Sequence, residues 1–188
     1  MELIDWPRRW STLSSSTPRL FLYSGRPSLG EVRELRVVND LIQRYALQPH
    51  PEGGHFKETY RAEHRVPGTN RSVCTAILYL LSAGERSTLH RIDADELWHF
   101  YQGDPLRIFE LQPSGEAKQT DLSASNPQHL VPAGTWFGSM PAEGSKFSLV
   151  GCTVAPGFEF EHFELGSRAT LLAEFPRARV VIELLGRE

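Results

Sequence analysis

His90 and Glu96 are two ionisable side chains in a stretch with the residue alternation of β-strands. Alternate residues of a strand share a face, so His90 lies on the same face as Ile92. After a turn, Glu96 lies on the same face as Trp98. An imidazole and a carboxylate among aromatic rings can transfer protons, because burial and neighbouring charges tune both groups. The pair therefore predicts either acid–base catalysis or a hydrogen bond that only satisfies two buried polar groups.

A second set of candidate residues surrounds Gly53-Gly54 and the aromatic positions. Glycine lets the backbone approach a ligand closely, and aromatic rings can stack on a planar or sugar ligand. The alternative is an ordinary turn and plain core packing. Lys57 and Arg61 fall on the opposite strand face and are expected in solvent. The candidate ligand-binding residues are Glu52, Phe56, Glu58, Tyr60, Trp98, Phe100, Trp136 and Phe137.

Short β-rich segments must position these residues. They follow one another from Gly53 onward, separated by turns rich in Pro and Gly. A spacing of about 8–12 residues is typical of a β-sandwich or barrel. Strands are predicted near 54–63, 72–81, 86–91, 96–102, 106–112, 116–121, 128–132, 135–140 and 146–155.

Helices are expected on either side of the strands. Residues 28–31 read Ser-Leu-Gly-Glu, a capping box, and apolar residues then recur at helical spacing until Pro49. Ser167 could cap a short helix that stops at Pro176. Residues 180–185 are expected to add a strand or to trail away.

Length and composition exclude several classes of protein. The chain has 188 residues, enough for one domain and a short extension, and its net charge is −3. Without a cationic surface we expect no nucleic-acid or membrane partner. Cys74 and Cys152 lie in apolar runs with no signal peptide before them, so we expect reduced cysteines and a cytoplasmic location. The Arg- and Ser-rich residues 1–30 leave organelle targeting as an alternative.

His90 and Glu96 belong to a longer pattern. The stretch from Gly84 to Gly103 fits G-x5-H-x-H-x3-E-x6-G, and residues 132–137 read P-A-G-T-W-F against P-x-G-x2-H. These stretches resemble the two cupin motifs, with Ile92 and Phe137 in place of two histidines. Further segments narrow the resemblance to the DUF985 (Cupin_5) subfamily, over roughly residues 38–176. These segments are P-H-P-E-G-G-H-F-K-E-T-Y, E-L-W-H-F, V-P-A-G-T-W and G-C-T-V-A-P-G-F.

This resemblance implies an all-β fold, a double-stranded β-helix (a jelly-roll, RmlC-like cupin barrel) with an N-terminal helix and a short C-terminal helix. It implies a ligand pocket inside the barrel, a homodimer, and no settled activity. We expect an N-terminal extension at 1–30, a cupin domain at 31–176 and a C-terminal tail at 177–188. Gly54, Phe56, Glu58 and Tyr60 also distantly resemble the G-x-F-x-E-x-[FY] strand of dTDP-4-dehydrorhamnose 3,5-epimerases.

A divalent metal needs more ligands than the motif retains. Zinc and non-haem iron sites use about three protein ligands, and only His90 and Glu96 remain. Alternation points His99 away from Glu96. Sequence does not place three further histidines that could complete the set. We expect no cofactor, with a divalent metal on His90 and Glu96 as the alternative; the three histidines are His55, His129 and His162.

Three functions follow. The first is binding of a small polar metabolite, carbohydrate- or nucleotide-like, with metal-free epimerase or isomerase chemistry. The second is a metal-dependent oxygenase or isomerase with a remodelled ligand set. The third is a dimer that binds a small molecule without chemistry.

Overall fold

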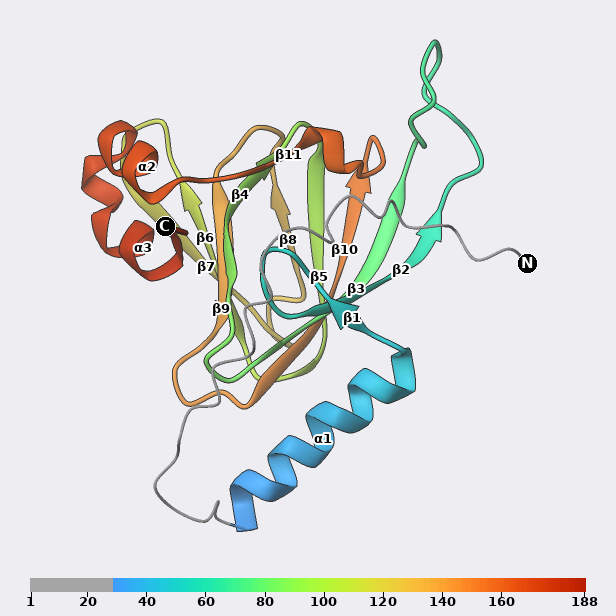
Figure 1. The fold of residues 1–188 in the computed structure, drawn as a ribbon, viewed down its shortest axis with the longest axis vertical. Coiled ribbons are helices and arrows are strands. Elements are labelled where there is room, and N and C mark those ends of the chain that lie inside the picture. Colours follow the sequence, from blue (N-terminus) through green and yellow to red (C-terminus); the bar gives the residue numbers. More distant parts are fainter. Residues whose placement is uncertain (1–28) are drawn as a thin grey trace.

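The strands form two facing antiparallel sheets. The computed structural model describes the backbone of residues 29–188 and the side chains of residues 36–188 (Figure 1). The first sheet has the order β1-β2-β3-β10-β5-β8 and the second β11-β4-β9-β6-β7. The strands are β1 (Gln48–Pro49), β2 (His55–Arg61), β3 (Thr75–Ser82), β4 (Ser87–Ile92), β5 (Asp95–Gly103), β6 (Leu106–Leu111), β7 (Ala117–Leu122), β8 (Gln128–Val131), β9 (Phe137–Pro141), β10 (Phe147–Ala155) and β11 (Phe163–Leu165).

This arrangement confirms the predicted jelly-roll barrel. The chain passes repeatedly from one sheet to the other, so that most strands pair with strands distant in sequence. Each of the nine predicted strands overlaps one of β2 to β10. Strands β1 and β11 have two and three residues, too few to show a periodic pattern. The predicted extension, residues 1–30, lies almost wholly outside the described residues.

The main core fills the space between the sheets. Tyr79, Trp98 and Phe137 are almost completely buried there, and their rings meet edge to face around Trp98. Aromatic pairs in this geometry stabilise a core beyond the area that they bury. Packed apolar side chains therefore fill this part of the barrel interior.

The outer face of β3 is covered by α1 (Leu29–Tyr45). Leu41 and Leu47 pack on Leu80 and Leu149, and each buried leucine contributes about 1.5–3 kcal/mol. This explains why β3 reads as a continuous apolar run, since its alternate residues face the barrel core and the helix. The predicted N-terminal helix is thus confirmed.

Two short helices cover the second sheet (Figure 1). The predicted helix after Ser167 is confirmed as α2 (Arg168–Glu174). The expectation that residues 180–185 add a strand or trail away is wrong, because α3 (Arg179–Leu185) is helical. Its Ile182 and Leu185 are fully buried among Leu89, Phe109 and Leu171. Tertiary burial outweighs the strand preference of the two valines at its start.

Two further expectations can be compared with this structure. Cys74 and Cys152 are both free thiols, as expected, and Cys152 is the buried one. Among residues 29–188, the helices are too short or too polar to cross a lipid bilayer.

Candidate functional site

One end of the barrel holds a cavity of about 1380 Å³. Side chains of β2, β3, β4, β5 and β10 line it, together with residues from the segment 156–163. Apolar atoms form most of the surface of the cavity, although more than half of the lining residues are polar or charged. Its inner polar groups, brought from four separate segments, are His50, Glu52, His90, Glu96 and Cys152.

His90 on β4 is buried with a defined tautomer. Its Nδ1 lies 2.8 Å from the carbonyl oxygen of Thr88 and 3.2 Å from Oε2 of Glu52. A carbonyl oxygen only accepts hydrogen bonds, so Nδ1 carries the proton and donates it. In the neutral ring the lone pair is then on Nε2, the other nitrogen of an imidazole that lines the cavity.

Glu52 reaches His90 from the turn before β2. Gly53 adopts φ 119°, and a side chain there would overlap the carbonyl oxygen of Arg86, so only glycine fits. The Thr88 amide donates to the Glu52 carbonyl oxygen at 2.9 Å, which ties the turn to β4. The Tyr79 hydroxyl donates to the Gly53 carbonyl oxygen at 2.7 Å. The turn therefore fixes the Glu52 carboxylate beside the imidazole.

His50 is a cavity residue that sequence reasoning missed. The Glu52 amide donates to its Nδ1 at 3.4 Å, so the proton of the neutral ring lies on Nε2. Burial lowers the pKa of His50, with His90 adding to this and Glu52 opposing it. The signal available in the sequence was its position two residues before Glu52 in the Pro-His-Pro-Glu-Gly-Gly turn.

Glu96 and Cys152 lie on neighbouring strands. Burial, with a smaller contribution from the nearby Glu52, raises the pKa of Glu96 to about 7, although His90 and a hydrogen bond with Cys152 act to lower it. Burial and the Glu96 charge raise the pKa of the Cys152 thiol well above its ordinary value, so it stays protonated. The expected pairing is therefore revised: His90 and Glu96 share the cavity, but the carboxylate in contact with His90 belongs to Glu52.

The predicted face of β2 is broken by a bulge. Phe56 and Glu58 line the cavity, but Tyr60 is 55% exposed, because the register with β3 shifts between Glu58 and Tyr60. The same shift brings Arg61 to the cavity instead of to solvent, where its guanidinium contacts Glu58 at 2.8 Å. Lys57 is exposed, as expected, at the edge of the lining.

The other predicted aromatic residues lie outside the cavity lining. Trp98 and Phe137 belong to the packed core, and Phe100 packs against that core. Trp136 lies on the outer face of the second sheet, with α2 and α3, and Arg91 stacks over its ring at 4.5 Å. Alternation along the strand separates Trp136 from Phe137. The expected stacking platform is thus not formed by these four rings.

The residues present do not fit a divalent metal. Phe137 stands directly opposite His90 across the β4–β9 ladder, with ring centroids 4.2 Å apart. His99 faces outward as expected and contacts Thr153 Oγ1 at 3.0 Å. The three histidines considered as extra ligands contact other carboxylates. Within residues 29–188, no group of three or more His, Cys, Asp or Glu could hold a metal ion. The pairs formed by those histidines are His55 with Glu85, His129 with Glu110 and His162 with Asp93.

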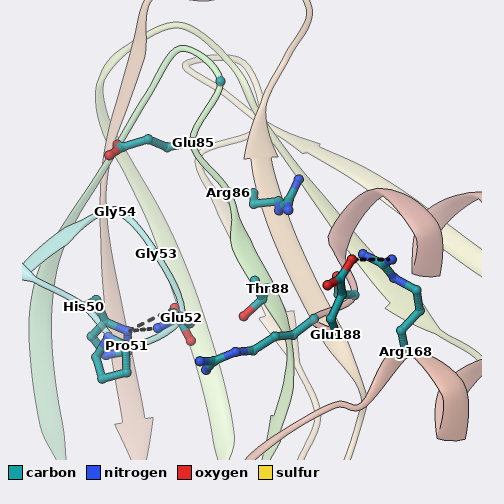
Figure 2. A pocket seen from close by; sticks show the side chains of 13 residues that line it. His50, Pro51, Glu52, Gly53, Gly54, Glu85, Arg86, Thr88, Arg168 and Glu188 are labelled. Atoms are coloured by element: carbon teal, nitrogen blue, oxygen red, sulfur yellow. Dashed lines mark hydrogen bonds and ion pairs between the residues drawn. The ribbon is translucent and has the colours of Figure 1, made fainter. Parts of the chain in front are cut away.

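A second, smaller hollow of about 600 Å³ lies behind the Glu52 turn. Figure 2 shows Gly53, Gly54 and Arg86 around it, with Arg168 close to Glu188 on its far side. His50 and Glu52 line both this hollow and the barrel cavity. The two residues thus form part of the wall between the cavity and the outside of the barrel.

Known proteins are similar to this chain in sequence and in fold. A family model described as "Cupin superfamily (DUF985)" matches residues 39–166. An X-ray structure of a Shewanella oneidensis protein is 40% identical, covers 79% of this chain and 96% of its own, and has a TM-score of 0.75. A hypothetical protein from Leishmania major is 32% identical, with 80% and 98% coverage and a TM-score of 0.74.

A curated relative from Saccharomyces cerevisiae is described as an uncharacterized protein. It is 27% identical over 145 residues, which cover 66% of this chain and 72% of the relative. The family match spans well over half of the chain. The chain belongs to the DUF985 family of the cupin superfamily.

Proposed function

We propose that the barrel binds a small polar metabolite, carbohydrate- or nucleotide-like, and catalyses metal-free proton transfer of the epimerase or isomerase type. The observation that carries this proposal is the position of His90 Nδ1, 2.8 Å from the Thr88 carbonyl oxygen and 3.2 Å from Glu52 Oε2. A histidine held in this way is oriented as a general base, with a carboxylate that stabilises the imidazolium formed in the reaction.

The first step removes a proton from carbon. Nε2 of His90 takes the proton of a C–H bond next to a carbonyl group; the electron pair of that bond forms a C=C bond, and the π pair of the carbonyl group moves to its oxygen. Glu52 offsets the positive charge that develops on the imidazole. The product of this step is an enol or enolate held in the barrel.

The oxygen of this intermediate needs a proton donor. His50 carries its proton on Nε2, and Glu96, whose pKa is about 7, is partly protonated at neutral pH. Two ionisable groups kept in different protonation states are the usual arrangement for acid and base roles in one site. Return of a proton to the opposite face of the carbon gives an epimer, and return to the neighbouring carbon gives an isomer.

The distant resemblance to dTDP-4-dehydrorhamnose 3,5-epimerases supports this reaction type only in part. Phe56 and Glu58 of the matching strand line the cavity, whereas Tyr60 is exposed. The proposal therefore rests on the contacts of His90 and not on that strand.

Deuterium exchange tests the proposed function. The protein is incubated in D₂O with dihydroxyacetone or fructose, and NMR follows the loss of the C–H signal next to the carbonyl. We expect exchange with the wild type and a loss of about 100-fold or more in His90→Asn, since general-base catalysis contributes about that much. Glu52→Gln should also be slow.

The control variant is His64→Asn, because His64 is an exposed histidine outside the cavity lining. It should exchange at the wild-type rate, and thermal unfolding should show that all the variants fold. Wild-type exchange in His90→Asn would contradict the catalytic role. Binding without exchange of any of these compounds would favour a binding protein without chemistry.

A further inference from the structure

Three phenylalanines form an aromatic wall beside His90. We call Phe158, Phe160 and Phe163 the aromatic wall; all three line the cavity. Their ring centroids lie 4.9 Å to 6.1 Å apart. His90 lies 5.4 Å from Phe163, and His50 is stacked 6.5 Å from Phe160. The wall is thus within about one ring's width of the proposed base and acid.

Polar bonds to the backbone anchor the aromatic wall. Arg61 donates to the Phe158 carbonyl oxygen at 3.1 Å, and Arg71 donates to the Gly157 carbonyl oxygen at 2.7 Å. The Phe158 amide donates to Thr75 Oγ1 at 2.9 Å. These bonds join the segment to β2 and β3, so the wall is a built surface and not a loosely placed loop.

The cations near the wall are already neutralised. Arg61 contacts Glu58 at 2.8 Å and Glu159 at 2.6 Å. Arg71 forms two 2.8 Å bonds with Asp93. Lys57 is the one other Lys or Arg of the described lining, and it is exposed at the edge.

The inner polar groups include no lysine or arginine either, and each of the two histidines already faces a carboxylate. The inner polar groups are two carboxyl groups, a protonated thiol and two histidines that contact one of the carboxylates; these groups are Glu52, Glu96, Cys152, His50 and His90. A phosphate or carboxylate placed among them would lose its water shell without gaining a counter-ion. Burying an uncompensated charge in this way is costly.

We propose that the ligand of this barrel carries a planar unsaturated ring, without phosphate or carboxylate on it, that stacks on the aromatic wall. This inference rests on the proposed function, because it places the reacting carbon at His90 Nε2 and the ring on Phe160 and Phe163. The 5.4 Å separation of His90 and Phe163 requires the ring and the reacting carbon to be joined directly or through a few bonds. Stacking between rings adds to the free energy of burying them.

Three matched ketones test this inference. Acetophenone has an unsaturated ring, cyclohexyl methyl ketone a saturated ring, and 4-acetylbenzoate a ring with a carboxylate. Saturation-transfer NMR titrations measure their dissociation constants with the full chain. We expect acetophenone to bind about tenfold more tightly than either of the other two.

A pair of variants locates the ring. Phe160→Leu keeps an apolar side chain but removes the aromatic face, so it should weaken acetophenone about three- to tenfold and leave cyclohexyl methyl ketone unchanged. Tyr101→Leu is the matched control, since Tyr101 is 56% exposed and outside the cavity lining. Equal binding of the two uncharged ketones, tighter binding of 4-acetylbenzoate, an unaltered Phe160→Leu, or no binding of any ketone would overturn the inference.

The same samples separate this inference from the proposed function. In D₂O the methyl protons of acetophenone exchange only if the site transfers protons. His90→Asn should keep acetophenone binding and lose the exchange. Ring-selective binding without exchange in the wild type would refute proton transfer and leave the ring inference standing. Exchange of all three ketones without a preference in binding for the unsaturated ring would refute the ring inference and leave proton transfer standing.

Discussion

Replacing Glu96 with Gln should make the protein less sensitive to alkaline pH. Burial raises the pKa of Glu96 from 4.5 to about 7, whereas in the unfolded chain the carboxyl has its ordinary value. A carboxyl with a raised pKa stabilises the folded state fully below its unfolded pKa, and this contribution is lost as pH rises through the folded pKa. The difference of about 2.5 pKa units corresponds to about 3 kcal/mol of unfolding free energy.

Urea unfolding of the wild type and Glu96→Gln, at about pH 4 and about pH 8, measures this effect. Glutamine resembles the protonated carboxyl, so the two proteins should be similar at the lower pH. At the higher pH the variant should be more stable by about 3 kcal/mol, or about 6–12 °C in melting temperature.

The control is Glu143→Gln, since Glu143 is exposed in the turn between β9 and β10. It should follow the pH dependence of the wild type. If the stability difference between the wild type and Glu96→Gln is the same at both pH values, Glu96 is not held in a buried, weakly solvated position, and the proposed acid role loses its basis.

Three further substitutions probe the supports of the site. Gly53→Ala should lose at least about 2 kcal/mol and the proton exchange, because the new side chain meets the Arg86 carbonyl oxygen; Gly134→Ala has open space and should cost about 1 kcal/mol. Equal costs in thermal unfolding would refute this. Burial raises the pKa of Glu110, but the hydrogen bond and charge of His129 outweigh it and leave the pKa below 4.5. Glu110→Gln should therefore cost about 2 kcal/mol at neutral pH, a deficit that disappears as pH falls through the lowered pKa; an equal deficit in urea unfolding at about pH 3 would contradict it. Arg71→Lys should speed amide hydrogen exchange of residues 157–163 about tenfold, because lysine lacks the fork that reaches both Asp93 and the Gly157 carbonyl oxygen; unchanged exchange would show that this anchor is dispensable.

The barrel could be predicted from the sequence because two independent signals indicate its strands. Their apolar alternation follows the barrel interior, and Gly and Pro mark each turn. The expectation for residues 180–185 is wrong because adjacent valines favour a strand locally, whereas a helix here buries Ile182 and Leu185 against the second sheet. Such contacts between distant segments are not encoded in local periodicity.

The site was predicted only in part for the same reason. His90 and Glu96 do line one cavity, because strand alternation carries through β4 and β5. The contact of His90 with Glu52 depends on a turn that packs on β4. The presence of Arg61 instead of Tyr60 in the cavity lining depends on a β-bulge. Neither can be read from spacing alone. The homodimer and the cytoplasmic location stay predictions.

The most direct test of this account is the position of the proton on His90. Long-range ¹H–¹⁵N NMR of the imidazole distinguishes the protonated nitrogen from the bare one. The contacts of Nδ1 with the Thr88 carbonyl oxygen and Glu52 predict a proton on Nδ1 and a bare Nε2 whose signal shifts when a ketone is added. A proton on Nε2 with a bare Nδ1 would leave His90 without the lone pair on Nε2 that removes the proton, and would contradict the proposed mechanism.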